Sequence, residues 1–312
     1  MKKINSCLNS WAILTIASLT WSPLLRPARA EPAVTAQPQS NSAIANEVNL
    51  STNSDFLNET ESVDIYVPPP EQSNYRVCEV LLRPTINSII EKNTGKWGIL
   101  VEKLEDRTII YNYNADKYLI PASNIKIITT AAALQRLDPE APIRSTSIRN
   151  WVTITNQRSN NAYADTLLRY IGGPTAAKTA LAQMGVNPGW FRLADGSGMS
   201  RNNVATPRAF VEILRAMYYS PKREVFHASL PIAGMSGTLK DRMRATPAQG
   251  TVYAKTGTLT GVRALSGYIH HPHYGILVFS IIANNPKQSG KALVRAIDQI
   301  VLQLSQVTPC EL

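Results

Sequence analysis

The sequence predicts a mixed α/β fold of the α+β type, with one antiparallel sheet assembled from both ends of the chain. Two apolar segments, residues 97–102 and 108–112, read as a hairpin around a charged turn. Three more, residues 251–257, 262–270 and 274–284, read as strands near the end of the chain. The segments between these groups have helical spacing, so five strands enclose a helical middle in the sequence.

The first thirty residues have the layout of a secretory signal peptide. Lys2 and Lys3 precede the apolar run Trp11–Leu19, and Ala28-Arg29-Ala30 places small residues at a cleavage position. The run is too short to span a bilayer, and no later stretch is long and apolar enough to do so. We therefore expect an exported protein of the periplasm or cell envelope, with no transmembrane anchor after cleavage.

Charge divides the rest of the chain at about residue 75. Residues 31–75 carry seven acidic groups and no Lys or Arg, and their Ser, Asn, Thr, Glu and Pro predict a disordered acidic tether. Residues 76–312 carry 28 basic and 15 acidic groups, a net +13 within a whole-chain charge of +10. This excess fits anionic partners such as wall polymer or membrane headgroups, or equally a solvated basic face. Nucleic acid is not expected, because no basic run is interleaved with aromatic residues.

The first predicted helices lie on either side of the hairpin. One covers Val77 to Glu91 and is interrupted at Pro84. The other runs from about Ser123 to Leu137, where threonines and an alanine run allow tight packing.

Three further helices complete the prediction. Residues 161–171 form one that ends at Gly172-Gly173, and another begins at Pro174. Pro207 opens a helix that continues to Tyr218, and an amphipathic helix covers residues 291–304. We thus expect a single domain over 76–312, with a helical lobe at about 123–250.

A serine and a lysine lie one helical turn apart in Ser123-Asn124-Ile125-Lys126. A serine hydroxyl needs an adjacent base to act as a nucleophile. Lysine can be that base when burial lowers its pKa, and isoleucines surround Lys126 in the sequence.

Two later motifs supply the remaining groups of such a site. Ser159-Asn160-Asn161 offers a second hydroxyl and an amide, and Lys255-Thr256-Gly257 places a second lysine on a predicted strand. Gly257 is expected to let a substrate backbone approach closely. A Ser-x-x-Lys, Ser-x-Asn and Lys-Thr-Gly trio is typical of serine acyl-transfer enzymes that bind penicillin.

With these motifs in this order, the chain resembles the D-alanyl-D-alanine carboxypeptidases of peptidase family S13, the class C low-molecular-mass penicillin-binding proteins. The resemblance runs from about residue 77 to the end of the sequence. The matching stretches are Pro121–Lys126, Ser159–Asn161, Asp195–Arg201, Gly237–Leu239 and Lys255–Leu259.

The resemblance implies five catalytic residues. Ser123 would be acylated and Lys126 would take its proton. Ser159 would relay a proton to the leaving group, Asn161 would hold the substrate, and Lys255 would set the electric field around Ser159.

It also implies a substrate-binding strand. Thr256 and Thr258, on either side of Gly257, would bind the terminal carboxylate. The backbone N–H groups of Ser123 and Thr258 would form the oxyanion hole.

The resemblance further implies a fold like that of serine β-lactamases and penicillin-binding transpeptidases. That fold is a five-stranded antiparallel sheet flanked by helices, with a helical lobe beside it. The implied activity is removal of the terminal D-Ala from peptidoglycan peptides, perhaps with endopeptidase cleavage, and β-lactams would be covalent inhibitors. No cofactor is implied. Members of the family usually carry extra domains between the first two motifs, and here the segment Leu137 to Trp151 replaces them.

Several residues have two readings. Ser159 and Asn161 are predicted to be catalytic, and the alternative, which is compatible with this, is that they cap the helix that follows. Asp195 and Ser197 are interpreted as rim or structural residues. Arg263 would meet a substrate carboxylate at the rim or form a surface salt bridge.

The cysteines and histidines add two expectations. Cys78 and Cys310 would form a disulfide in an exported protein, or remain two buried thiols. His270, His271 and His273 lie around Pro272 in a predicted turn, where exposed side chains are expected rather than a metal site.

Two rival functions remain open. One is a serine β-lactamase or esterase on the same fold, although no Glu-x-x-x-Asn helper follows Asn161. The other is a cell-wall-binding homologue without activity, against which the intact Ser123, Lys126 and Lys255 argue.

Overall fold

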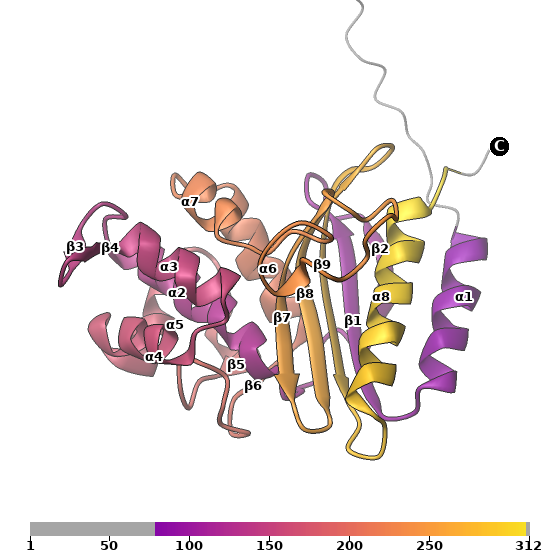
Figure 1. Ribbon diagram of the computed structural model, residues 1–312, viewed down its shortest axis with the longest axis horizontal. Helices are drawn as coiled ribbons and strands as arrows, with labels where there is room; N and C mark the ends of the chain where they lie inside the picture. Colours follow the sequence, from indigo (N-terminus) through magenta and orange to yellow (C-terminus); the bar gives the residue numbers. More distant parts are fainter. Residues whose placement is uncertain (1–78, 310–312) are drawn as a thin grey trace, which may run out of the picture. The chain divides into compact units, whose positions relative to one another are not determined.

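The computed structural model describes residues 79–309, which are built around one five-stranded antiparallel sheet (Figure 1). Its strands are β1 (Lys96–Lys103), β2 (Ile109–Tyr113), β7 (Val252–Leu259), β8 (Val262–His271) and β9 (Gly275–Asn284). Their order across the sheet is β2-β1-β9-β8-β7, so the early and late strands meet at the β1–β9 pair. The prediction of one antiparallel sheet drawn from both ends of the chain is confirmed.

Helices cover both faces of this sheet. Helices α1 (Glu79–Lys92) and α8 (Gly290–Gln306) lie on one face, and α6 (Pro207–Tyr218) lies on the other (Figure 1). The α1 helix continues through Pro84, because that residue is on the exposed side and removes only one backbone bond. The predicted interruption at this position is therefore wrong.

Strand β9 shows why the strands of the sheet are apolar along their whole length in the sequence. Leu277, Phe279 and Ile281 pack in the cluster that contains α1 and α8 residues, whereas Val278 and Ile282 pack toward the helical part. A strand that is buried on both faces has no polar side to alternate with its apolar side.

The segment between β2 and β7 forms the helical part. Its helices, besides α6, are α2 (Ile125–Arg136), α3 (Ile148–Gln157), α4 (Asn161–Tyr170), α5 (Gly173–Gln183) and α7 (Arg223–Ala228). Short 3-10 turns are η1 (Ala122–Asn124), η2 (Pro188–Trp190) and η3 (Gly237–Leu239). Two small hairpins are β3–β4 (Pro142–Ile143 and Thr146–Ser147) and β5–β6 (Phe191–Arg192 and Val204–Ala205).

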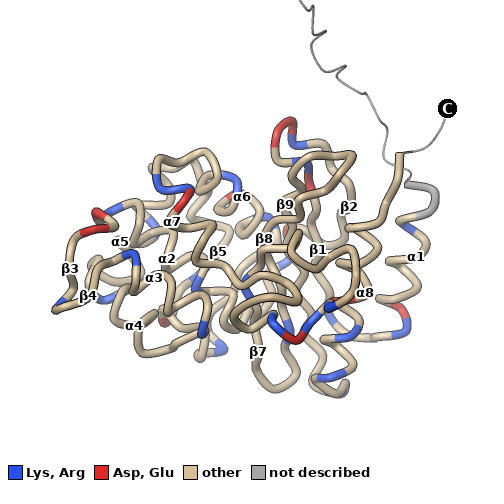
Figure 2. The backbone as a smooth tube through the Cα atoms, turned by 45° about the horizontal axis from the view of Figure 1, so that its top comes forward, with Lys and Arg blue, Asp and Glu red and all other residues tan. Residues whose placement is uncertain are grey.

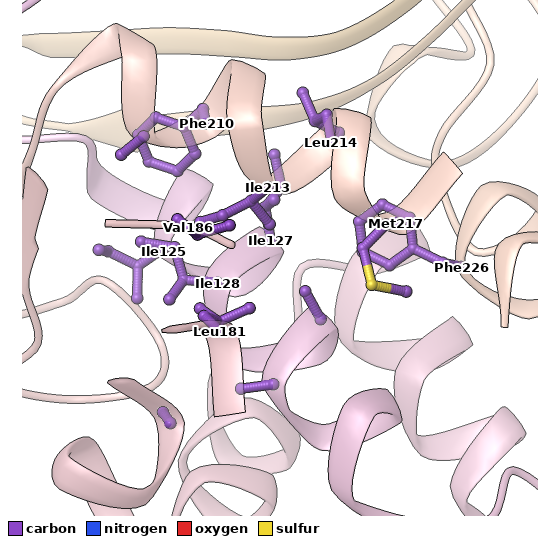
Figure 3. Close-up of a cluster of buried hydrophobic side chains, with 14 of the residues drawn as sticks. Ile125, Ile127, Ile128, Leu181, Val186, Phe210, Ile213, Leu214, Met217 and Phe226 are labelled. Carbon is purple, nitrogen blue, oxygen red and sulfur yellow. The ribbon is translucent and has the colours of Figure 1, made fainter. Parts of the chain in front are cut away.

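Helix α2 is the centre of the helical part. Ile125, Ile127 and Ile128 lie among apolar side chains that include Leu181 of α5 and Phe210 of α6 (Figure 3). Every residue from Ile125 to Leu134 is buried, so α2 is enclosed on all sides. A polar side chain on this helix is therefore held in an apolar and closely packed setting.

The segment that replaces the expected insert holds the β3–β4 hairpin and the beginning of α3. Sequence analysis did not predict α3. The predicted signal peptide and acidic tether lie outside the described residues, as do Cys78 and Cys310.

Surface charge and helix length bear on partners. Lys and Arg residues are distributed over many elements of both the sheet and the helical part (Figure 2). In the described part of the chain, no helix combines the length and apolar character needed to cross a bilayer.

Candidate active site

Ser123 lies in the turn η1, immediately before α2. Ala122 has a left-handed backbone with φ of 51°, which is costly for a residue with a side chain. Ala122 and Asn124 are fully buried, whereas Ser123 is only half-buried. The strained turn therefore leaves the Ser123 hydroxyl partly exposed between two buried residues.

Two glycines allow the surrounding backbone to approach this turn. A Cβ on Gly198 would lie 2.0 Å from the carbonyl oxygen of Ala122, and one on Gly257 would lie 2.4 Å from that of Pro121. Both distances are far below any tolerated contact. Gly257 thus lets β7 pack against the turn η1, a reason different from the substrate approach that the sequence suggested.

Lys126 is fully buried and faces Ser123. Its Nζ is 3.1 Å from Ser123 Oγ, 2.7 Å from Asn161 Oδ1 and 2.6 Å from the carbonyl oxygen of Ser197. Burial lowers the pKa of Lys126 to about 8, against the opposing effect of the Asp165 and Asp195 carboxylates. About a tenth of this amine is therefore uncharged at pH 7, and about half at pH 8.

The contacts of Lys126 fix the direction of its lone pair. A neutral amine has two N–H bonds and one lone pair. The amide oxygen of Asn161 and the carbonyl oxygen of Ser197 can only accept hydrogen bonds, so they take the two N–H bonds. The Ser123 hydroxyl is the one neighbour with a proton to give, and the lone pair is left facing it.

Ser159 and Lys255 form a second hydroxyl–amine pair. Lys255 is fully buried, and its Nζ lies 2.9 Å from Ser159 Oγ and 3.0 Å from the carbonyl oxygen of Thr256. Burial, followed by repulsion from Lys126, pushes the pKa of Lys255 well below its usual range.

Ser159 has a left-handed φ of 53°. Asn160, rather than Ser159 or Asn161, caps α4 by accepting a hydrogen bond from the Tyr163 N–H.

Strand β7 borders the site as the edge of the sheet. The segment 231–233 pairs with Val252 and Ala254 on its outer side and stops before Lys255. Thr256 Oγ1 donates to Thr238 Oγ1 at 2.8 Å, and Thr258 is exposed. An edge left open from Lys255 onward can pair with an extended peptide.

Two polar contacts that the sequence did not predict support the turn η1 and the preceding residue Ile120 from the sheet. Asn124 Nδ2 donates to Ser266 Oγ at 2.7 Å. The side chain of Asn284, at the end of β9, exchanges two hydrogen bonds of 2.9 Å with the backbone of Ile120. These partners are 142 and 164 residues away, and no local pattern indicates them.

The three rim candidates occupy different environments. Arg263 donates to the carbonyl oxygens of Leu259 and Val262 and so holds the β7–β8 turn. Ser197 is only 1% exposed, so its side chain is not on the rim, and the structural role is the alternative that remains. Asp195 is half-buried and accepts backbone hydrogen bonds from its own loop.

The histidines do not gather into a metal centre. His271 is buried, contrary to expectation, and its Nδ1 accepts from the backbone N–H groups of His273 and Tyr274. His270 instead faces His227, with their Nε2 atoms 3.4 Å apart. Within residues 79–309, no three His, Cys, Asp or Glu side chains are arranged to hold a metal ion.

Comparison with protein families identifies one match over most of the chain. The model of the D-Ala-D-Ala carboxypeptidase 3 (S13) family matches residues 82–146 and 141–307. The two pieces meet at the β3–β4 hairpin, in the segment that replaces the expected insert.

Curated relatives are similar over about half of this chain. A D-alanyl-D-alanine carboxypeptidase of Actinomadura sp. strain R39 is 41% identical over 164 residues, covering 47% of this chain and 30% of that protein. The penicillin-sensitive carboxypeptidase A of Dictyostelium discoideum is 35% identical over 182 residues, covering 52% and 35%. The chain thus spans about a third of the length of these relatives.

Solved structures show the same fold at low sequence identity. Penicillin binding protein 4 (dacB) from Haemophilus influenzae is 14% identical with a TM-score of 0.62, covering 70% of this chain and 99% of that chain. A class A β-lactamase from Clostridium kluyveri is 17% identical with a TM-score of 0.60, covering 73% and 100%.

Proposed function

Because the chain belongs to the D-Ala-D-Ala carboxypeptidase 3 (S13) family, we propose that it is a serine-type D-Ala-D-Ala carboxypeptidase acting on peptidoglycan stem peptides. The observation that carries the proposal is the contact of 3.1 Å between Lys126 Nζ and Ser123 Oγ, made by a buried amine with a pKa of about 8. A hydroxyl beside such an amine is an activated nucleophile.

Acylation would follow from the geometry in two proton transfers. The lone pair of Lys126 takes the hydroxyl proton as Ser123 Oγ attacks the carbonyl carbon of the penultimate D-Ala. As the C–N bond breaks, Ser159 gives its proton to the leaving D-Ala nitrogen. The proton that Lys126 took from Ser123 is then passed through Lys255 to Ser159, whose Oγ lies 2.9 Å from Lys255 Nζ. Water then attacks the ester at Ser123, which releases the shortened peptide and restores the hydroxyl.

Substrate binding would use the open edge of β7. A stem peptide would lie along the strand from Lys255 to Leu259, with its terminal carboxylate at Thr256 and Thr258. Beside the β7–β8 turn lies a cavity of about 630 Å³, lined in part by Ile120, Arg201 and Thr260. We infer that the remainder of the stem would extend past the end of β7 toward this cavity.

The setting proposed for this activity is the periplasm or cell envelope, after removal of the signal peptide. Cleavage of peptide cross-links as an endopeptidase is part of the same proposal. β-Lactams would acylate Ser123 as analogues of the D-Ala-D-Ala ending.

Fluorescent penicillin tests the proposal directly. We expect the full chain to be labelled covalently and Ser123→Ala to lose the label entirely, with release of D-Ala from a stem peptide lost in parallel. Lys240→Arg, at an exposed lysine, is the matched control and should label normally. Label that survives in Ser123→Ala rules out the nucleophile.

The class A β-lactamases with this fold favour a second candidate, rapid β-lactam hydrolysis. Fast deacylation needs a base that directs water at the ester. Within residues 79–309, the side chains of Ser123 and Lys126 make no hydrogen bond to a carboxylate. We therefore expect a long-lived penicilloyl-enzyme, and rapid turnover of benzylpenicillin would favour the rival.

A further inference from the structure

The loop 195–200 contacts both Lys126 and the turn that holds Ser123. The carbonyl oxygen of Ser197 accepts a hydrogen bond from Lys126 at 2.6 Å. One residue later, Gly198 packs so closely on Ala122 that no side chain fits between them. A shift of this loop would therefore move the general base and the nucleophile turn together.

One carboxylate holds the backbone of this loop. Asp195 accepts hydrogen bonds from the N–H groups of Ser197 at 3.1 Å, Gly198 at 2.6 Å and Ser200 at 2.7 Å. Fully buried Asn203 donates to the same carboxylate at 2.9 Å and accepts from the Ala194 N–H at 2.7 Å. Such charge-assisted bonds are stronger than neutral ones, so the loop has one well-defined conformation.

We propose that Asp195 is a positioning residue for the reaction. Its carboxylate fixes the Ser197 carbonyl where that oxygen occupies one N–H of Lys126, and this turns the amine lone pair toward Ser123. The inference rests on the proposed function, because it takes Lys126 as the general base.

The Asp195 carboxylate acts on Lys126 both by its charge and by positioning the loop, and loss of each should change the acylation rate in opposite directions. The two effects can therefore be measured separately. The Asp195 carboxylate raises the pKa of Lys126, as Asp165 also does. Loss of the charge alone would lower that pKa and supply more free amine at neutral pH. Loss of the positioning would instead lower the acylation rate at every pH, including the plateau where the amine is fully deprotonated.

The test is the pH profile of acylation of the full chain by a fluorescent penicillin, from pH 6 to 9.5. Asp195→Asn should lower the plateau about 10- to 100-fold, the size expected from a misplaced reacting group, while its inflection moves to lower pH. Asp195→Glu keeps the charge but its longer arm displaces the three N–H partners. It should lower the plateau with the inflection near that of the wild type.

Asp165→Asn is the matched control. The Asp165 carboxylate also raises the pKa of Lys126, but it accepts from a single loop N–H, that of Gly196 at 2.9 Å. For Asp165→Asn we expect the inflection of the pH profile to move to lower pH, while the plateau rate of acylation stays close to that of the wild type. Thermal melting checks that each variant is folded, and Asp195→Glu carries the test if Asp195→Asn unfolds.

The outcomes separate this inference from the proposed function. Plateaus of Asp195→Asn and Asp195→Glu equal to that of the wild type, or no lower than that of Asp165→Asn, overturn the positioning role. A wild-type chain that takes no label, or label that persists in Ser123→Ala, overturns the proposed function instead.

Discussion

At the scale of single residues, the candidate site depends on two amines whose pKa values burial lowers toward neutral pH. Lys126 and Lys255 are both fully buried, and each is within hydrogen-bond reach of one serine hydroxyl. Desolvation favours the neutral form of an amine, and two nearby amines disfavour each other's charge. Burial thus lets a lysine side chain act as a base, whereas the same side chain exposed to water would be protonated at neutral pH.

The pKa of Lys126 predicts the pH dependence of acylation. Because only the neutral amine can take the proton from Ser123, the rate should rise as pH approaches about 8 and level off above it. Lys126→Arg cannot lose its proton in this range and should reduce acylation about 10²- to 10⁴-fold. The measurement is the acylation rate of both proteins across pH, and a flat wild-type profile would contradict the role of Lys126.

A second residue-scale prediction concerns Gly198. Gly198→Ala should slow acylation and lower the melting temperature, because the new Cβ would strike the Ala122 carbonyl. Gly185 is the matched control, since its φ of 83° resembles the 86° of Gly198 but nothing lies within 4 Å of its Cβ position. Gly185→Ala should cost about 1–2 kcal/mol from backbone strain alone and leave acylation intact. Equal losses of activity would refute the steric explanation.

At this scale the sequence motifs predicted the candidate reacting residues but not the residues that support them. The spacing of Ser123 and Lys126 shows that they share a helix face, and the structure brings Ser159, Asn161 and Lys255 to the same place. The bond from Asn124 to Ser266 is different, because it joins residues 142 positions apart. Nothing local to either residue encodes such a contact.

At the scale of elements, the beginning of α4 is the point where packing and the candidate site meet. Asn160 caps this helix, with Ser159 on one side and Asn161 on the other. The cap therefore fixes the direction in which both neighbouring side chains point.

Two cap substitutions should separate stability from activity. Asn160→Ala and Ser289→Ala each remove an N-cap acceptor, at α4 and α8 respectively, and each should cost about 1 kcal/mol of unfolding free energy. Only Asn160→Ala should also slow penicillin acylation, because Ser159 and Asn161 lose their fixed orientation. Urea unfolding and labelling rates test this, and it fails if both variants label at the wild-type rate.

The predicted elements were accurate where local signals agree with packing. Pro207 at the first turn and the apolar spacing after it predicted α6 with the bounds Pro207–Tyr218 that the structure has. Helix α3 was missed because Ile148–Gln157 is rich in β-branched residues, which favour strands. Burial of Ile148, Trp151 and Val152 stabilises the helix there despite this preference.

At the scale of the whole molecule, one half-buried and one buried histidine link stability to pH. Burial, followed by a neighbouring histidine in each case, lowers the pKa of His227 and His271 to about 4. The unfolded chain binds these protons near pH 6.5, so between about 6.5 and 4 the unfolded state holds more protons than the folded state.

The unfolding free energy should therefore decrease as the pH falls through this window. Urea unfolding at a series of pH values measures it, with His227→Phe as the comparison because it removes one of the titrating groups. The slope against pH should be shallower in His227→Phe. An identical slope would show that His227 does not contribute.

The arrangement of strands across the sheet was beyond the reach of the sequence. Five strands and their antiparallel sense follow from apolar runs and short turns, but the β1–β9 pairing depends on contacts between distant segments. Neither periodicity nor the resemblance to a known family predicted the order of the strands across the sheet.

The position of β9 between β1 and β8 has a consequence for how the polypeptide matures. During synthesis, β1 emerges long before its neighbour β9, so its apolar edge stays bare while α2 can already form. Such late, long-range pairing gives high contact order and slow folding, and a bare edge can pair with another copy. We therefore expect the yield of soluble protein to depend on the chaperone capacity of the expression host more than on the stability of the folded protein.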